Sequence, residues 1–239
     1  MTIAALNLKE KLKTFFKNFE INENELNQIC HSSEFIRVSN KTEIIQFLQP
    51  LKSIYLIHYG SMKVSFPSIE RDHIISFLAR GDIFGVDNLF TGQIFSQYQL
   101  TALEDSAVIK VSMDVANDLW MKNPDLKNYL GLQLQARNNE IFLDKLLSTA
   151  PTGQRIAVLF QRALLCQNHN NANRISVRLT RKDIAHRVGA RVETVIRTLS
   201  DWQKKGVVQM ADGYIEVTNA QLLGDYAGEF HCDLFLKNC

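Results

Sequence analysis

The apolar positions in the N-terminal half of the chain recur as short runs. Between residues 34 and 112, runs rich in β-branched and aromatic residues alternate with turn residues at a spacing of about ten residues. The runs are EFIRVS, TEIIQFL, SIYLIHYG, SMKVSFP, HIISFLARGD and YQLTALEDSAVIKVS. This spacing predicts an antiparallel sandwich or barrel, with turns at Gly60 and at Gly81–Asp82. Before it, lysines alternate with apolar residues over residues 1–20 and predict a short amphipathic helix.

From Ser112 onward the pattern becomes helical. Ser112 or Asp114 can cap a short helix, and Asn123 followed by Pro124 marks the start of a long helix of about six turns. Apolar residues form two stripes on this long helix, one of Leu126, Leu130, Leu134 and Ile141 and one of Leu132, Ala136 and Leu143. A helix that is apolar on two sides needs two partners. We expect the β domain on one side and the same helix of a second copy on the other, which makes residues 123–147 a homodimer interface; the alternative is a helix buried within a monomer.

The stretch STAPTGQ (residues 148–154) interrupts the helical pattern with Pro151 and Gly153, and it predicts a hinge between domains. After it we expect an apolar helix (QRIAVLFQRALLCQ), a polar loop (NHNNAN), a short alternating strand (RISVRLT) and a hairpin (GVVQMADGYIEVTN) that turns at ADG.

Between the strand and the hairpin lie two short helical patterns. Thr180 and Asp183 have the spacing of a capping box, so a helix begins there. Gly189 interrupts the pattern, and a second helix follows over residues 191–204. The residues expected on the buried faces of the two helices are Ile184, Ala185, Val188, Val195, Leu199 and Trp202. Two short helices joined by a tight turn that contains glycine are typical of a helix-turn-helix.

The outer side of the second helix carries four residues suited to reading DNA bases: Val192, Glu193, Ile196 and Arg197. Glu193 and Arg197 are four residues apart and project together. In a major groove, Arg197 can donate to guanine O6 and N7, Glu193 can accept from cytosine N4, and Val192 can contact a thymine methyl. Three further residues are expected to meet phosphates, namely Thr180, Arg181 and Arg191. The alternative for Glu193 and Arg197 is a surface ion pair worth about 0.2–0.5 kcal/mol.

The charge of the chain favours the DNA interpretation. Residues 1–149 carry a net charge of −2 and residues 150–239 a net charge of +4. Residues 172–205 hold nine basic and three acidic residues, a local charge of +6 that suits a polyanion. A solvated helix face would explain the charge alone, but not its coincidence with a helix-turn-helix and a following hairpin.

With these motifs the chain resembles bacterial transcription regulators of the cyclic AMP receptor protein/fumarate-nitrate reductase regulator (CRP/FNR) superfamily. The resembling segments are SIYLIHYGSMKVSF, ARGDIFGVDNLFTG, NPDLKNYL and, most specifically, LTRKDIAHRVGARVETVIRTLSDWQKKGVV. The resemblance implies an α+β fold with a β-roll (double-stranded β-helix), a long dimerisation helix and a C-terminal winged helix-turn-helix. The corresponding domains are 1–120, 121–150 and 151–239.

The resemblance also implies roles. Glu193 and Arg197 match the residues that read TGTGA-like or TTGAT-like half-sites, and VETVIR is more similar to the FNR type than to the cyclic-AMP type. Double-stranded DNA is the expected partner, with RNA polymerase as a second partner if the protein activates transcription.

The positions that hold cyclic AMP in the family differ here. Val86 stands where cyclic-AMP binders have a glutamate, Ser96 and Gln97 where they have arginine and serine, and Ile141 and Phe142 where polar residues contact adenine. A buried phosphate without a cationic partner is costly, so we expect no dependence on cyclic AMP. These five residues then form a pocket for another small effector, or no effector binds. In the second case we expect plain core at Val86, Leu89, Phe90, Ile141 and Phe142.

We expect no metal or other cofactor. An FNR-type iron–sulfur site needs clustered cysteines near the N-terminus, where only Cys30 lies. Cys166, Cys232 and Cys239 are scattered and predict free thiols, although Cys232 and Cys239 could also pair or bind a metal. A haem ligand remains an alternative, with His31, His58 and His73 as the candidate residues.

Other classes of function lack their motifs. The sequence has no P-loop, nucleophile elbow, HEXXH or GXGXXG motif, and His186 is expected to face solvent rather than act as a base. No apolar run reaches the length of a membrane span, and no signal-peptide pattern is present, so we expect a cytoplasmic protein without a membrane partner. The remaining alternative to a DNA-binding regulator is a signalling module of the cyclic-nucleotide-binding fold that binds a small molecule or haem.

Overall fold

The computed structural model describes residues 3–69, 72–165 and 173–228. They form two compact units. The first comprises the residues up to Val64 together with Leu78–Leu134, and the second comprises Ser65–Phe77 together with the residues from Gln135 onward. We describe each unit by itself.

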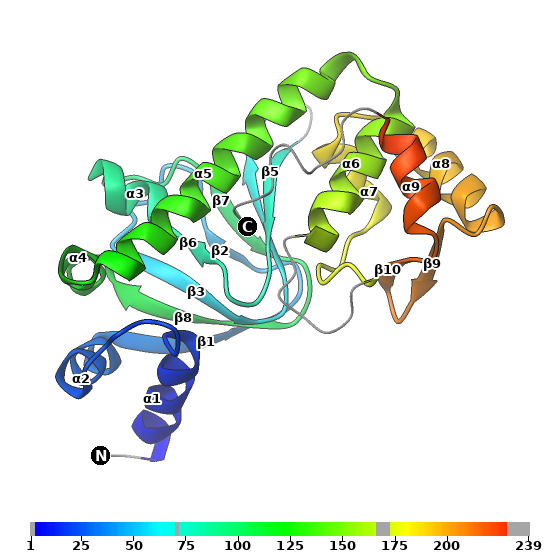
Figure 1. Ribbon diagram of the computed structural model, residues 1–239. Coiled ribbons are helices and arrows are strands. Elements are labelled where there is room, and N and C mark those ends of the chain that lie inside the picture. Colours follow the sequence, from blue (N-terminus) through cyan, green and yellow to red (C-terminus); the bar gives the residue numbers. More distant parts are fainter. Residues whose placement is uncertain (1–2, 70–71, 166–172, 229–239) are drawn as a thin grey trace. The chain divides into compact units, whose positions relative to one another are not determined.

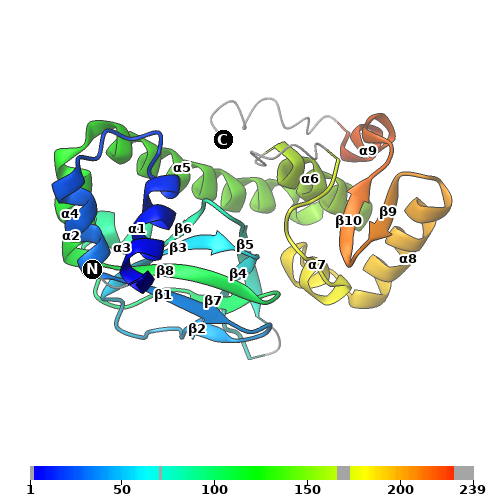
Figure 2. The same cartoon turned by 90° about the horizontal axis from the view of Figure 1, so that it is seen from below.

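Two antiparallel four-stranded sheets make up the predicted β-roll (Figures 1 and 2). One sheet has the order β1-β8-β3-β6 and the other the order β2-β7-β4-β5. The strands are β1 (Ser33–Val38), β2 (Glu43–Ile45), β3 (Ser53–Tyr59), β4 (Met62–Phe66), β5 (His73–Leu78), β6 (Ile83–Phe84), β7 (Gln99–Ala102) and β8 (Ser106–Ser112). Each of the six apolar runs between residues 34 and 112 contains at least one of these strands. Strand β6 was not predicted, because two residues are too short to show alternation.

Strand β3 contributes buried side chains to two hydrophobic clusters, one on each face of its sheet. Its residues alternate between the two faces of the sheet, as a pleated strand requires. Tyr55 and Ile57 join the cluster of buried residues that fills the space between the sheets. Ile54 and Leu56 point the other way, into a cluster covered by helices. Because both faces are buried, β3 is a nearly continuous apolar run rather than an alternating one.

Four helices cover the outer face of the first sheet. The predicted N-terminal helix is α1 (Ile3–Phe15), and the predicted short helix after the roll is α4 (Met113–Lys122). Two helices were not predicted, α2 (Glu23–His31) and α3 (Val86–Thr91). For α2 the signal was present, since Asn22 and Glu25 form a capping box whose two hydrogen bonds are both 3.0 Å long.

The long helix α5 (Pro124–Leu146) begins where the sequence predicted, with the Oδ1 atom of Asn123 accepting from the backbone N–H of Leu126 at 2.9 Å. Leu126 and Leu130 are buried in the first unit. In the second unit Leu143 is buried, whereas Ile141 and Phe142 are 42% and 53% exposed. The expectation that these last two residues are core of the single chain is therefore wrong. It is also wrong for Phe90, which is 36% exposed, whereas Val86 and Leu89 are buried as expected.

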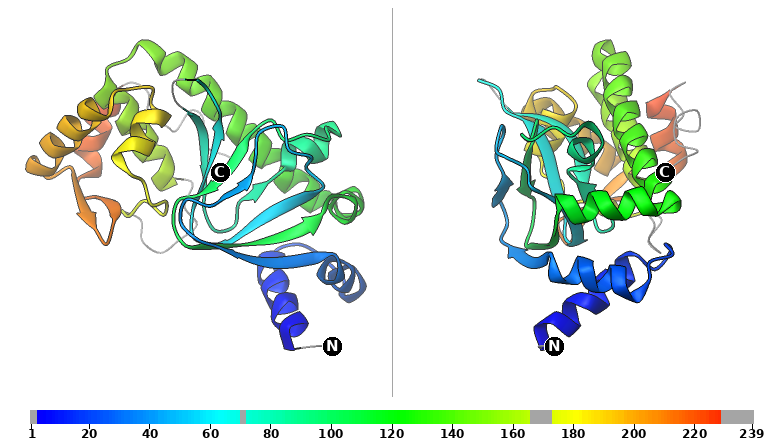
Figure 3. Two further views of the ribbon diagram at one scale, coloured as in Figure 1. Left: turned by 180° about the vertical axis from the view of Figure 1, so that it is seen from behind. Right: turned by 90° about the vertical axis from the view of Figure 1, so that its left-hand side faces the viewer.

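The second unit contains the predicted winged helix-turn-helix (Figure 3). Its predicted elements are α6 (Thr152–Leu165), α7 (Arg181–Arg187), α8 (Val192–Lys204), β9 (Val208–Ala211) and β10 (Tyr214–Val217). A further helix that was not predicted, α9 (Ala220–Ala227), follows the hairpin. Asp212 and Gly213 join β9 to β10 with φ angles of 52° and 82°, the two positive values of a type I′ hairpin turn.

Two expectations for this unit need correction. The hinge is shorter than predicted, because the 3₁₀ turn Leu147–Thr149 is followed almost at once by α6, which includes Gly153. The segment RISVRLT forms a single bridge, between Arg174 and Glu216, rather than a strand. Its alternation persists as the burial of Ile175, Val177 and Leu179. Residues 168–172 of the predicted polar loop lie outside the described residues.

Candidate nucleic-acid interface

The predicted capping box sets the start of α7. The hydroxyl of Thr180 accepts from the backbone N–H of Asp183 at 3.1 Å, and the Asp183 carboxylate accepts from the backbone N–H of Thr180 at 3.2 Å. Two otherwise unpaired N–H groups are thereby satisfied. From this start, Ile184, Ala185 and Val188 turn inward and are buried, as the sequence predicted.

A tight turn then redirects the chain into α8. Gly189 has a φ angle of 63°, which a residue with a side chain rarely adopts. The backbone N–H of Ala190 donates to the carbonyl of Ala185 at 2.9 Å. From α6, the guanidinium of Arg155 donates to the carbonyl of Val188 at 2.6 Å, so the turn is held from a third helix.

The buried face of α8 fixes its rotation about its own axis. Val195, Leu199 and Trp202 are all buried, as predicted. The Trp202 ring packs edge-on against the Phe160 ring of α6, with ring centroids 6.2 Å apart. It also packs in a tilted arrangement against the Tyr226 ring of α9, with ring centroids 5.0 Å apart. With this face held on two helices, the opposite face of α8 must point to the surface.

The four predicted base-reading residues lie on or beside that outer face. Glu193 and Arg197 are exposed, Ile196 is 46% exposed, and Val192 is half-buried. Among the described residues, the side chains of Glu193 and Arg197 make no hydrogen bond or ion pair. The surface ion pair that was the alternative explanation for these two residues is therefore not formed.

The three residues predicted to meet phosphates are also exposed. Thr180 and Arg181 stand at the N-terminus of α7, and Arg191 is the N-cap residue of α8. Both helix starts present backbone N–H groups, which favour anions.

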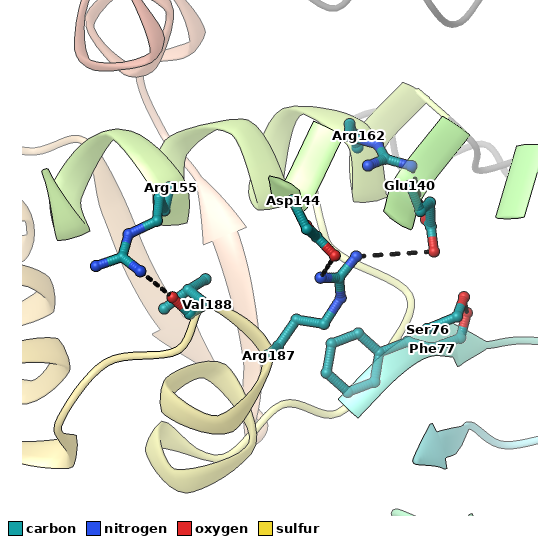
Figure 4. A network of polar contacts seen from close by, with 8 residues as sticks. All are labelled: Ser76, Phe77, Glu140, Asp144, Arg155, Arg162, Arg187 and Val188. Atoms are coloured by element: carbon teal, nitrogen blue, oxygen red, sulfur yellow. Dashed lines mark hydrogen bonds and ion pairs between the residues drawn. The ribbon is translucent and has the colours of Figure 1, made fainter. Parts of the chain in front are cut away.

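Arg187 does not belong to the exposed positive charge that the sequence predicted for residues 172–205. It is one of the nine basic residues of segment 172–205, but it is only 7% exposed (Figure 4). Its guanidinium is hydrogen-bonded to Asp144 and lies 3.8 Å from a carboxylate oxygen of Glu140. Glu140 also pairs with Arg162 at 2.9 Å. Partial burial raises the pKa of the Asp144 carboxyl, and the adjacent Arg187 charge opposes that rise. The sequence offered no signal for this network, because its members come from three helices.

Comparison with known proteins agrees with this geometry. Residues 154–226 match the family model of the Crp-like helix-turn-helix domain, and residues 35–123 match that of the cyclic nucleotide-binding domain. The fumarate nitrate reduction regulatory protein of Klebsiella oxytoca is 30% identical over 220 residues, which cover 88% of this chain and 86% of the relative. The chain belongs to the CRP/FNR family of transcription regulators.

Further members of the CRP/FNR family support the assignment. The fumarate and nitrate reduction regulatory protein of Salmonella typhi is 30% identical over 219 residues, covering 88% of this chain and 85% of the relative. The structure of FixK2 from Bradyrhizobium japonicum matches with a TM-score of 0.71 and 18% identity, over 81% of this chain and 96% of that one. A CooA mutant from Carboxydothermus hydrogenoformans matches with a TM-score of 0.69 and 15% identity, over 91% and 95%. These two structures share the fold, and the relatives identify a DNA-binding transcription regulator.

The predicted effector residues of this CRP/FNR regulator are not brought together within one unit. Val86 is buried in the first unit, and Ser96 is also buried there, its hydroxyl donating to the carbonyl of Tyr98 at 2.7 Å. Gln97 is exposed and donates to the side chain of Gln93 at 2.6 Å. Ile141 and Phe142 belong to the second unit. The pocket formed by these five residues therefore stays a prediction.

The candidate metal and haem ligands are dispersed. Within residues 3–69, 72–165 and 173–228, no three His, Cys, Asp or Glu side chains gather as they would around a metal ion. His31 and His73 are exposed. Burial lowers the pKa of His58, and the nearby positive charges of Lys11 and Arg80 lower it further. Cys30 is buried and is not part of a disulfide bond. Cys166, Cys232 and Cys239 lie outside the described residues.

Two smaller expectations can also be compared with the structure. His186 is half-buried rather than fully exposed. In the part of the chain that is described, none of the helices has the length and apolar character needed to cross a membrane.

Proposed function

We propose that this regulator binds a palindromic DNA site with TGTGA-like or TTGAT-like half-sites as a homodimer, with α8 as the recognition helix. The observation that carries the proposal is the orientation of α8. Its apolar face is packed on α6 and α9, and the outward side chains of Glu193 and Arg197 make no hydrogen bond or ion pair with any described residue.

Within a major groove, each outward residue has a distinct role. Arg197 donates two hydrogen bonds to guanine, and Glu193 accepts one from cytosine. The apolar Val192 and Ile196 contact thymine methyl groups. Thr180, Arg181 and Arg191 bind phosphates and set the position of the helix without reading sequence.

The second half of α5 supports the homodimer. Ile141, Phe142 and Leu146 are large apolar residues on its exposed surface, with exposed fractions of 42%, 53% and 45%. Exposed apolar side chains that are close together on one helix suit a self-complementary interface around a two-fold axis. A two-fold dimer presents two copies of α8, which matches a palindrome.

The regulator is proposed to act without cyclic AMP. Val86 offers no carboxylate for a ribose, and the buried Ser96 hydroxyl already donates to the carbonyl of Tyr98. The space between the two sheets is filled by side chains such as Tyr55, Ile57 and Phe84. A nucleotide phosphate buried there would need a cation in place of these apolar groups.

Fluorescence anisotropy with two labelled duplexes of equal length and composition tests the DNA site. One duplex carries the palindrome and the other a scrambled sequence. We expect the palindrome to bind at least about a thousandfold more tightly at the same salt concentration. Equal affinity for the two duplexes at every salt concentration would contradict sequence-specific reading by α8.

A further inference from the structure

Four ionised side chains of the second unit form one network that joins three helices. They are Glu140 and Asp144 of α5, Arg162 of α6 and Arg187 of α7 (Figure 4). The Arg187 guanidinium is hydrogen-bonded to Asp144 and lies 3.8 Å from a carboxylate oxygen of Glu140. Arg162 pairs with Glu140 at 2.9 Å. The network therefore connects the end of the long helix to the first helix of the helix-turn-helix.

The two arginines of this network are shielded from water. The exposed fraction of the side chain is 3% for Arg187 and 6% for Arg162. Their Nε–H groups are buried and make no hydrogen bond with the described residues. Water therefore cannot easily replace a carboxylate that is lost, and a buried guanidinium without its partner is strongly unfavourable. An ion network of this kind favours one arrangement of the helices that carry it.

The end of α5 presents this network and the proposed dimer contact on different sides. Glu140 and Asp144 are four residues apart on one side of the helix, next to the buried Leu143. Phe142 and Leu146 are four residues apart on another side and are 53% and 45% exposed. In the proposed homodimer, one short stretch of helix thus contacts the second copy and also holds α7.

Helix α7 in turn determines where α8 lies. Arg187 is the last residue of α7, two positions before the left-handed Gly189. Across this turn the backbone N–H of Ala190 donates to the carbonyl of Ala185 at 2.9 Å, and α7 and α8 contact each other. A helix pair joined so closely moves as one body, so a contact that holds α7 on α5 also holds α8.

We propose that this four-residue network fixes the distance and rotation between the two copies of α8, and thereby sets the half-site spacing that the regulator accepts. Arg187 and Asp144 are then positioning residues that act on DNA reading without contacting DNA. The inference rests on the proposed function, because it needs the homodimer and α8 as its recognition helix.

Half-site spacing is a sensitive measure of such positioning. The half-sites of a dimer lie about 34–36 Å, or one turn of DNA, apart. One extra base pair moves a half-site by about 3.4 Å and rotates it by about 35° around the DNA axis. A dimer with a fixed α8 pair loses contacts at the new spacing, whereas a dimer with a loosened pair can follow the half-site.

Hydrogen exchange of the full-length protein without DNA tests whether the network holds α7. Asp144→Asn keeps the size of the side chain and removes the charge that pairs with Arg187. We expect the backbone amides of α7 and of the end of α5 to exchange at least about threefold faster, with those of β9 and β10 unchanged. Glu34→Gln is the matched control, because it removes a carboxylate that lies 3.9 Å from Lys110 in the first unit, and it should leave α7 unchanged.

Fluorescence anisotropy with a series of duplexes tests the spacing. The series contains a single half-site, the palindrome with its best spacer, and the palindrome with one or two extra base pairs. For the unaltered protein we expect each extra base pair to lower the affinity at least about tenfold, and for Asp144→Asn less than about threefold. The affinity of Asp144→Asn for the single half-site should be unchanged, because the base-reading residues stay in place. A merely structural defect of the helix-turn-helix would weaken that half-site too.

Variants of the arginine assign the effect to the ion pair. Arg187→Lys keeps the charge and should retain most of the spacing preference, whereas Arg187→Gln should lose it. The double variant Asp144→Asn/Arg187→Gln should lose no more than either single variant, because both changes break the same pair. Should Arg187→Gln fail to fold, Asp144→Asn decides, since the Asp144 side chain is 43% exposed and an amide there stays solvated.

The proposal is overturned if α7 of Asp144→Asn exchanges as slowly as α7 of Glu34→Gln, if Asp144→Asn keeps the full spacing preference, or if the unaltered protein accepts every spacing equally. A palindrome that binds no better than a scrambled duplex would instead contradict the proposed reading by α8. The exchange rates would then still decide whether the network holds α7.

Discussion

Arg187 and Arg197 lie ten positions apart and carry the same charge, but they occupy opposite environments. Arg187 is paired with acidic residues of α5, whereas the Arg197 side chain is exposed and makes no hydrogen bond or ion pair with the described residues. A guanidinium that is already paired cannot also bind DNA without giving up its partners. At the residue scale, burial rather than charge therefore decides which arginines of segment 172–205 are available to a polyanion.

We predict that Arg197→Ala abolishes discrimination between the palindrome and the scrambled duplex. A bidentate contact to guanine is worth about 1–3 kcal/mol of discrimination, and a dimer makes two such contacts. Anisotropy with both duplexes measures the change as a ratio of affinities. The idea fails if the variant keeps the original preference.

Arg181→Ala is the contrasting variant. A phosphate contact carries no sequence information, so its removal should weaken both duplexes alike. The slope of log K against log salt should become shallower by about 1 for each phosphate that the variant no longer neutralises. Arg197→Ala should therefore change the ratio of the two affinities, whereas Arg181→Ala should lower both affinities and leave their ratio unchanged.

At the scale of single elements, α7 and α8 are determined mainly by signals within a few residues. The capping box at Thr180, the left-handed Gly189 and the spacing of Val195 and Leu199 all act locally, and all were visible in the sequence. Two elements that were missed, β6 and α3, are too short to establish a period. RISVRLT has a clear strand pattern but only one bridging partner, because a strand requires a neighbour that local sequence cannot supply.

We predict that Thr180→Ala lowers the free energy of unfolding by about 0.5–2 kcal/mol, because it removes one half of the capping box. Thr180→Ser keeps the hydroxyl and should lie close to the unaltered protein. Urea denaturation followed by circular dichroism measures both variants. Equal stability of the alanine and serine variants would show that the cap contributes nothing.

At the scale of the whole molecule, the exposed apolar residues of α5 are the basis of the proposed homodimer. We predict that Phe142→Glu raises the dimer dissociation constant at least about a hundredfold. Each buried phenylalanine contributes about 1.5–3 kcal/mol, and a two-fold interface contains two of them. Sedimentation velocity over a range of concentrations measures the shift.

Met121→Glu is the control for this prediction, since Met121 is an exposed apolar residue of α4 and lies outside the proposed interface. It should leave the dimer unchanged. A Phe142→Glu variant that dimerises as well as Met121→Glu would place the interface elsewhere or show that the protein is a monomer.

We also predict that the intact protein does not respond to cyclic AMP. Calorimetric titration with cyclic AMP should give no heat above that of dilution, because neither Val86 nor Ser96 supplies a charged partner for the nucleotide. Micromolar binding would contradict the assignment of these positions.

The sequence by itself determined the strands of the roll except β6, the start of α5, and the capping box, turn and buried face of the helix-turn-helix. These features depend on backbone preferences and side-chain periods within one element, so neighbouring residues are enough to specify them. Only the tertiary structure decided that Arg187 is buried, that Ile141 and Phe142 are exposed on the chain, and that Arg187 shares an ion network with Arg162, Glu140 and Asp144. Such outcomes depend on groups far apart in sequence, as with Arg187 and Asp144, whose positions are 43 residues apart. The energy of an ionised side chain is set by what packs around it, and a local pattern does not contain that information.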